Sequence, residues 1–272
     1  MSEDAPRLLV VGAHPDDAEL KAGGLAALYR NAGRDVAFVS LTDGGAGHHR
    51  LGRTDIAERR RREAVHAADV VGADVDVWDY EDGALTTDVS IRTRLIRLIR
   101  RVEPALVLTH RPYDYHPDHR ATARLVADSA YLVTVPNVCP ETPALATDPV
   151  YGYVPDEFQD PTPFEPDVVV DVDDVVEEKV EMCHRHASQM YEWLPAREGV
   201  LEEVPDGEDP RKRWLREFRG AEFTGVAERF REQLRARYGT ARGDSVEHAE
   251  AVEVSAYGRP LTAERREALF PW

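Results

Sequence analysis

Hydrophobic residues along this chain form short runs that alternate with segments of helical periodicity. The segments predicted as strands are residues 7–13, 34–42, 74–80 and 105–111. The segments predicted as helices are residues 18–32, 55–71, 89–102 and 118–133. Strict alternation of strand and helix requires parallel pairing with right-handed crossovers. We therefore expect an α/β protein with a Rossmann-like three-layer α/β/α fold and a mainly parallel sheet.

The order loosens in the second half of the chain. Residues 136–166 carry eight prolines, which predicts an ordered loop excursion that acts as a lid or an oligomer contact. A strand at 167–172 and a helix at 173–190 follow, and the polar remainder is predicted to be helical around 208–238. We expect one domain over residues 1–272, with a core at about 7–195 and a C-terminal extension at about 196–272.

Composition narrows the class of protein. The chain has 272 residues with 42% hydrophobic content, no run approaches a membrane span, and the acidic N-terminus lacks a secretory core, so we expect a cytoplasmic protein. The net charge of −17 argues against nucleic acid as a partner. The basic cluster at 59–62 is then interpreted as a solvated helix face. Cys139 and Cys183 indicate neither a disulfide framework nor a zinc knuckle.

Two polar segments share one design, because each follows a buried strand and precedes a helix. The first is "HPDD" at 14–17, and the second is "HPDH" at 116–119. In open α/β sheets ligands bind beyond the carboxyl ends of the strands, and residues three apart at a helix start can face the same way. Each segment alone is also typical of a capped helix N-terminus. The presence of two such segments at equivalent strand ends favours a metal site. Two histidines with one carboxylate are typical ligands of a catalytic zinc ion.

The same motifs resemble the LmbE-like (PIG-L) family of zinc-dependent de-N-acetylases. The resemblance extends to "TDGGAG" at 42–47, to residues 60–85 and to "DVVVDVDDVVEEKVEMCHRHASQ" at 167–189, and covers roughly residues 7–195. It implies a small-molecule substrate, because the family hydrolyses N-acetyl groups from amino sugars such as GlcNAc-containing compounds. It also implies one Zn²⁺ per chain, with another divalent metal as the alternative.

Carried over by position, the resemblance implies a role for each residue of the two motifs. His14, Asp17 and His119 would bind the metal, and Asp16 would be the general base for metal-activated water. His116 would stabilise the oxyanion or protonate the leaving amine, and Asp118 would orient His116.

Further residues are candidates for the substrate pocket. Asp82 is a candidate ligand for sugar hydroxyls, with a turn-forming Asp-Gly as the alternative. Arg60 could line the pocket, although a solvated helix arginine is the simpler interpretation. His186 matches a family position near the active site or packs a helix. Asp114 is a candidate support for His116.

One position departs from the family pattern. Relatives commonly carry an acidic residue where this chain has Gly45, and His48 or His49 could fill the gap unless both are solvated loop residues.

Rival functions and the assembly state stay open at this stage. One alternative is a zinc amidase that cleaves a different acyl group or a thiol conjugate, and another is a non-catalytic sugar- or nucleotide-binding module. The absence of a G-x-G-x-x-G loop argues against the module. Aromatic residues in the C-terminal part are typical of subunit interfaces, and members of the family that the motifs resemble often form trimers or hexamers. We therefore expect a homo-oligomer, a trimer or hexamer.

Overall fold

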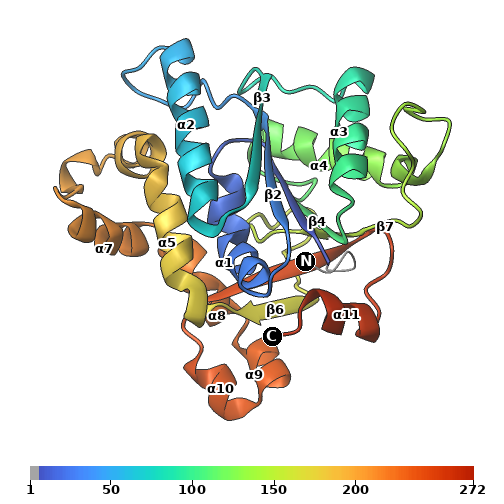
Figure 1. The fold of residues 1–272 in the computed structure, drawn as a ribbon. Helices are drawn as coiled ribbons and strands as arrows, with labels where there is room; N and C mark the ends of the chain where they lie inside the picture. The colour runs from blue at the N-terminus through green and yellow to red at the C-terminus, as the bar shows by residue number, and fades with distance from the viewer. Residues whose placement is uncertain (1–5) are drawn as a thin grey trace.

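A seven-stranded sheet forms the centre of the computed structural model, which describes residues 6–272 (Figure 1). The strands are β1 (Leu8–Gly12), β2 (Val36–Thr42), β3 (Asp74–Tyr80), β4 (Leu106–Thr109), β5 (Val150–Tyr153), β6 (Val168–Asp171) and β7 (Ala249–Gly258). Their order is β3-β2-β1-β4-β5-β7-β6, and only the pairs that include β7 are antiparallel. The predicted mainly parallel α/β sheet is confirmed.

Helices cover both faces of the sheet, as the hydrophobic pattern predicts. The five long helices of the first 185 residues are α1 (Asp17–Asn31), α2 (Arg53–Val71), α3 (Val89–Val102), α4 (Pro117–Ala130) and α5 (Val176–Arg185). Successive side chains of β1 point to opposite faces. Leu8 and Val10 pack on the side of α1, whereas Leu9 and Val11 pack on the side of α3 and α4 (Figure 1). None of the helices within residues 6–272 is long and apolar enough to cross a membrane.

The sheet gains two strands that the sequence pattern did not reveal. Strand β5 lies inside the proline-rich segment 136–166, and β7 lies in the C-terminal extension. Because β7 sits between β5 and β6, the extension completes the sheet of the core.

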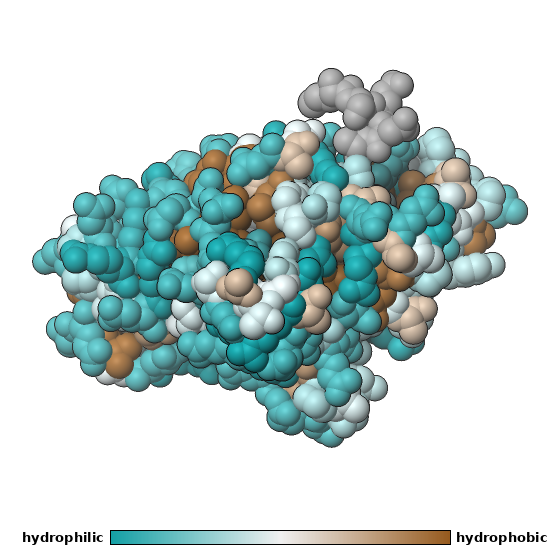
Figure 2. Space-filling model, turned by 90° about the horizontal axis from the view of Figure 1, so that it is seen from below, coloured by the Kyte–Doolittle hydropathy of each residue, from teal (hydrophilic) through white to brown (hydrophobic). Residues whose placement is uncertain are grey.

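The rest of the extension consists of short helices that pack against the core. They are α6 (Leu194–Glu198), α7 (Glu208–Phe218), α8 (Val226–Arg229), α9 (Arg231–Tyr238), α10 (Thr240–Ser245) and α11 (Ala263–Leu269). Tyr191, Phe223 and Phe230 are buried within their own subunit. Their presence in the sequence is therefore no argument for a subunit contact. The face in Figure 2 is largely hydrophilic, with hydrophobic residues in scattered areas.

The buried Glu250 carboxylate ties β7 to α1 by hydrogen bonds and to α5 by an ion pair. Helix α1 is kinked at Ala22 (φ −140°), which leaves the N–H groups of Gly24 and Leu25 free to donate to the Glu250 carboxylate at 2.8 and 2.7 Å. Lys179 of α5 lies 2.8 Å from the same carboxylate, and both side chains are buried. Glu250 thus compensates a break in the helix that begins at the candidate site.

Removing the Glu250 carboxylate should destabilise the protein strongly. Glu250→Ala leaves the Lys179 ammonium buried without its partner, which typically costs about 3–5 kcal/mol. Urea unfolding followed by circular dichroism measures the loss. The exposed Glu247 on the segment before β7 is the matched control, and Glu247→Ala should change the free energy of unfolding by less than about 0.5 kcal/mol. Equal midpoints for the two variants would contradict this account of β7.

Candidate active site

The candidate site lies where β1 and β4 end side by side. Val11 pairs with Thr109, whose hydroxyl donates to the Val11 carbonyl at 2.9 Å. The loops that follow these strands carry the two polar motifs, although these lie about a hundred residues apart in the chain. They open into a cavity of about 700 Å³, within the range of small-molecule sites.

Asp17, the first residue of α1, is the most constrained carboxylate of the site. Its Oδ2 accepts hydrogen bonds from the main-chain N–H groups of Ala13 and His14 at 2.9 and 2.8 Å. It also lies 3.1 Å from His110 Nε2, and its Oδ1 lies 3.5 Å from His119 Nε2. Burial opposes ionisation, but the charges of His119 and His110 outweigh it and hold the pKa of Asp17 well below its usual range.

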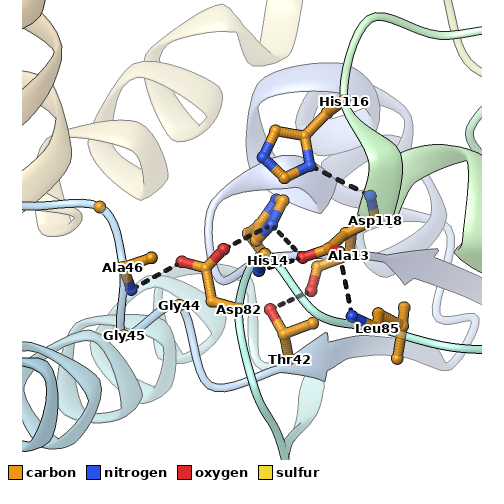
Figure 3. A network of polar contacts seen from close by, with 12 residues as sticks. Ala13, His14, Thr42, Gly44, Gly45, Ala46, Asp82, Leu85, His116 and Asp118 are labelled. Atoms are coloured by element: carbon orange, nitrogen blue, oxygen red, sulfur yellow. Dashed lines mark hydrogen bonds and ion pairs between the residues drawn. The ribbon is translucent and has the colours of Figure 1, made fainter.

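His14 and His119 each turn one ring nitrogen toward Asp17 and the other toward a carboxylate. Nδ1 of His14 lies 3.6 Å from Asp17, while its Nε2 lies 3.2 Å from both Asp82 and Asp118 (Figure 3). Nε2 of His119 faces Asp17, while its Nδ1 lies 2.9 Å from Asp114. Carboxylates that hold the far nitrogen of an imidazole in this way are typical of metal-ligating histidines.

The donor atoms fit a divalent metal ion. Within residues 6–272, His14, His116 and His119 form one group of donor atoms that lie within 4.8 Å of one another, and Asp17, His110 and His119 form a second. His119 belongs to both groups, whereas His14 occurs in the first and Asp17 in the second, and His14 forms a third group with Asp82 and Asp118. Two imidazoles and a carboxylate are a zinc-type donor set.

The structure corrects the expected partners of Asp118 and Asp114. We expected the Asp118 carboxylate to orient His116, but it contacts His14 and accepts from the N–H groups of Gly83 and Leu85 at 2.7 and 3.2 Å. We expected Asp114 to support His116, but its carboxylate contacts the ring of His119 and meets His116 only at the main-chain N–H. Both aspartates therefore hold predicted metal ligands rather than the predicted acid.

The electrostatics of His14 follow from these carboxylates. Burial disfavours the imidazolium, but contacts with Asp118, Asp17 and Asp82 outweigh it and raise the pKa of His14 well above its usual value. The same contacts lower the pKa values of Asp82 and Asp118, against the effect of burial. Without a metal ion, these carboxylates therefore favour the protonated form of His14, and a metal ion bound by this ring would displace that proton.

Asp16 is held apart from the cluster of imidazoles. Its backbone has φ 124°, a strained conformation for a non-glycine residue that is frequent at functional sites. Arg60 of α2 lies 3.1 Å from its carboxylate and donates to the carbonyl of Gly44 at 3.1 Å. Burial raises the pKa of Asp16, partly opposed by the charge of Arg60. Arg60 is only 3% exposed, so its interpretation as a solvated helix residue was wrong.

His116 stands above His14, with the two ring centroids 4.5 Å apart (Figure 3). Its Nδ1 accepts from the main-chain N–H of Asp118 at 3.2 Å, so the neutral ring carries its proton on Nε2. Burial and the neighbouring His14 and His119 lower the pKa of His116. A neutral imidazole with an Nε2–H group at the cavity wall can donate a hydrogen bond to a substrate oxygen.

The remaining sequence candidates divide between the cavity and its surroundings. Asp82 lines the cavity and accepts from the Ala46 N–H at 2.9 Å, which joins the 42–47 loop to His14 (Figure 3). His186 is fully buried, 3.1 Å from Glu19, and lies behind the site. His48 contacts Glu192 at 3.0 Å and is not part of the cavity lining. It therefore does not take the place of the acidic residue that relatives carry at the position of Gly45.

Two parts of the site lie outside the two polar motifs of the sequence. His110 stacks on His119 with ring centroids 3.9 Å apart and contacts Asp17. Its place at the end of a predicted strand was a signal that could have identified it. The outer wall of the cavity includes residues 154–158 of the proline-rich segment and residues from the C-terminal extension, and no motif marked either stretch.

Comparison with known proteins supports the resemblance that the motifs indicate. Residues 9–130 match the family model described as PIG-L, GlcNAc-PI de-N-acetylase. A diacetylchitobiose deacetylase from Thermococcus kodakarensis is 28% identical over 206 residues, 71% of this chain and 75% of the relative. A 4-oxalmesaconate hydratase from Pseudomonas putida is 29% identical over 195 residues, 68% of this chain and 74% of the relative. The matched residues 9–130 carry both polar motifs, and the family described by this model is the one that the motifs predict.

Solved structures confirm the fold. An N,N'-diacetylchitobiose deacetylase from Pyrococcus horikoshii superposes with a TM-score of 0.69 at 22% identity, covering 93% of this chain and 85% of that chain. The 4-carboxy-2-hydroxymuconate hydratase GalB from Pseudomonas putida superposes with a TM-score of 0.74 at 23% identity, covering 94% and 98%. The same architecture therefore occurs in proteins named as deacetylases and as hydratases.

Neutralising either supporting aspartate should weaken metal binding. Asp118→Asn and Asp114→Asn should each lower zinc affinity about 10- to 100-fold, because each removes a carboxylate that orients a ligating imidazole. Competition with a chromophoric chelator measures the affinity, and Asp79→Asn, at an exposed carboxylate on β3, is the control. Unchanged zinc affinity in Asp118→Asn, with only turnover impaired, would restore the role of orienting His116.

Proposed function

We propose that this protein is a zinc-dependent hydrolase that removes an N-acetyl group from an amino sugar, with GlcNAc-containing compounds as the substrate class. The observation that carries the proposal is that His14 Nδ1 and His119 Nε2 face the Asp17 carboxylate at 3.6 and 3.5 Å, beside a separately held carboxylate, Asp16. The names of relatives support the reaction, since they are deacetylases of diacetylchitobiose, N-acetylglucosaminyl malate and an inositol glucosaminide.

His14, Asp17 and His119 would hold one zinc ion per chain, with other divalent ions as alternatives. Bound there, the ion would polarise the acetamide carbonyl and lower the pKa of water. Asp114 and Asp118 keep the ligating nitrogens of the two histidines directed at this point. The protein thereby supplies a fixed donor set before the metal arrives.

Asp16 would act as the general base. Arg60 fixes its carboxylate at 3.1 Å, and burial raises its pKa, which makes it a better proton acceptor than an exposed aspartate. Asp16 would take a proton from the attacking water, and that proton is then available to the leaving amine nitrogen. The Nε2–H of His116 would donate to the acetamide oxygen as negative charge develops there.

Metal removal should abolish activity reversibly. Dialysis against a chelator should eliminate acetate release from N-acetylated amino sugars, and Zn²⁺ should restore it. Elemental analysis should find about one zinc ion per chain in the wild type, and much less in His14→Ala and His119→Ala. Full metal occupancy in both variants would show that the ligand assignment is wrong.

Asp16→Asn should separate catalysis from metal binding. The variant should retain zinc, because Asp17 and not Asp16 is the proposed ligand, and should lose about 10² to 10⁴-fold in kcat. Acetate release by coupled assay measures the loss. A variant with wild-type turnover would remove Asp16 from the mechanism.

A second candidate function is hydration of an unsaturated acid. One sequence relative and one structural neighbour are named as hydratases, and they favour this reaction. The superposition with the structural neighbour covers 98% of that neighbour's chain. A base beside a metal could equally direct water to an activated double bond. Loss of the ultraviolet absorbance of a conjugated acid, without acetate release, would select this reaction.

The acetate assay also addresses the remaining alternatives. An amidase for another acyl group or a thiol conjugate would release a different acid, and a non-catalytic sugar- or nucleotide-binding module would release none. Location in the cytoplasm and assembly into a trimer or hexamer stay predictions. Light scattering at micromolar concentration and varied salt checks the second, since like charge weakens association when screening is low.

A further inference from the structure

The outer part of the cavity differs in charge from the rest of the molecule. Beyond the inner wall that carries the histidines, Arg60 and the four aspartates beside them, the cavity lining contains six lysine and arginine side chains but only four acidic ones. The chain as a whole carries a net charge of −17. This part of the lining therefore has more basic than acidic side chains, in contrast to the chain as a whole.

Most of these cations are already engaged. Lys179 pairs with Glu250 at 2.8 Å, Arg219 with Glu222 at 2.6 Å and Arg111 with Asp156 at 3.1 Å. Lys21 shares Glu222 at 3.5 Å. Arg229 donates to the carbonyls of residues 156 and 164. These five side chains hold the cavity wall together and have little capacity left for a ligand.

Arg197 is different, because no hydrogen bond or ion pair engages its guanidinium within residues 6–272. It is exposed, lies on α6 and faces the cavity with Trp193 and Leu194. The same cavity lining includes the exposed Tyr115, whose ring lies 5.4 Å from that of His119. Arg197 therefore lines the cavity that contains the candidate metal site.

The segment that carries Arg197 is anchored. A π-helical turn, Gln189–Trp193, leads directly into α6, and such turns are frequent at functional sites. Within it, Gln189 donates to the Gly47 carbonyl at 3.0 Å, and Glu192 accepts from Arg59 at 2.6 and 3.0 Å and contacts His48. The base of α6 is thus fixed to α2 and to the 42–47 loop, while Arg197 projects from it without a partner.

We propose that Arg197 is a specificity-determining residue that binds an anionic group, a carboxylate or a phosphate, on the leaving-amine part of the substrate. The inference rests on the proposed function, because it narrows the amino sugar to a negatively charged conjugate. A guanidinium donates two parallel hydrogen bonds to either anion, and this geometry makes it selective against neutral groups. The cavity of about 700 Å³ leaves room for such a conjugate.

The test compares matched substrates on the zinc-loaded enzyme. The probes are methyl N-acetylglucosaminide, N-acetylglucosamine 1-phosphate and the malate glycoside of N-acetylglucosamine. The wild type should favour at least one charged probe by about 10-fold or more in kcat/KM, the usual effect of a hydrogen bond to a charged group. Comparison of the two charged probes tells phosphate from carboxylate.

Arg197→Gln should remove this preference through KM, with kcat little changed, because the contact lies away from the reacting carbonyl. Arg197→Lys should restore part of it. The matched control is Glu157→Gln, which neutralises an exposed acid of the same outer cavity and should keep the preference. A preference that survives in Arg197→Gln would come from the metal or another residue and would overturn the proposal.

Failure of the two proposals can be told apart. If the wild type releases acetate from all three probes equally well, the role of Arg197 is wrong while the deacetylase function stands. If no probe releases acetate, the deacetylase function is wrong, and calorimetric binding of the same probes decides the role of Arg197. Tighter binding of a charged probe that Arg197→Gln abolishes supports that role, and equal binding of charged and neutral probes refutes it.

Discussion

The pairing of β1 with β4 is the constraint on which the site depends. Parallel strands place their carboxyl ends at one edge of the sheet, so the segments after Gly12 and Thr109 must meet there. Both segments carry histidine and aspartate side chains, most of which are buried at this edge of the sheet. Buried ionisable groups are unfavourable without partners. The hydrogen bonds from the N–H groups of Ala13 and His14 to Asp17 fix the first of these groups, and the others are arranged around it.

Pairing of opposite charges explains how so many ionisable groups share one edge. Asp82 and Asp118 share the His14 imidazole and also accept from main-chain N–H groups, while Asp114 contacts the ring of His119. The arrangement directs one nitrogen of His14 and one of His119 toward Asp17. A metal ion bound there would supply positive charge that compensates these carboxylates in place of the proton of His14.

The sequence predicted the elements whose signal is local and missed those whose signal is not. Strands β1 to β4 and their helices have continuous apolar runs or helical periodicity, and the two motifs stand directly at strand ends. Strand β5 was hidden because prolines surround it, and β7 because it lies in a polar extension and pairs only with distant strands. In the sequence, Arg60 is one of four consecutive arginines on a predicted helix. Its burial against Asp16 depends on the 42–47 loop, whose conformation hydrophobic periodicity does not predict.

The orientation of the aspartates was beyond the sequence for a related reason. Residues 116–119 are adjacent in the chain, and adjacency suggests that Asp118 serves His116. Helix geometry instead directs neighbouring side chains in different directions, and Asp118 reaches across to His14, 104 residues away. Chain proximity identifies which residues enter the site, whereas the contacts between strands decide which of them act together. The fold alone does not set the reaction, because the same architecture occurs in proteins named as deacetylases and as hydratases.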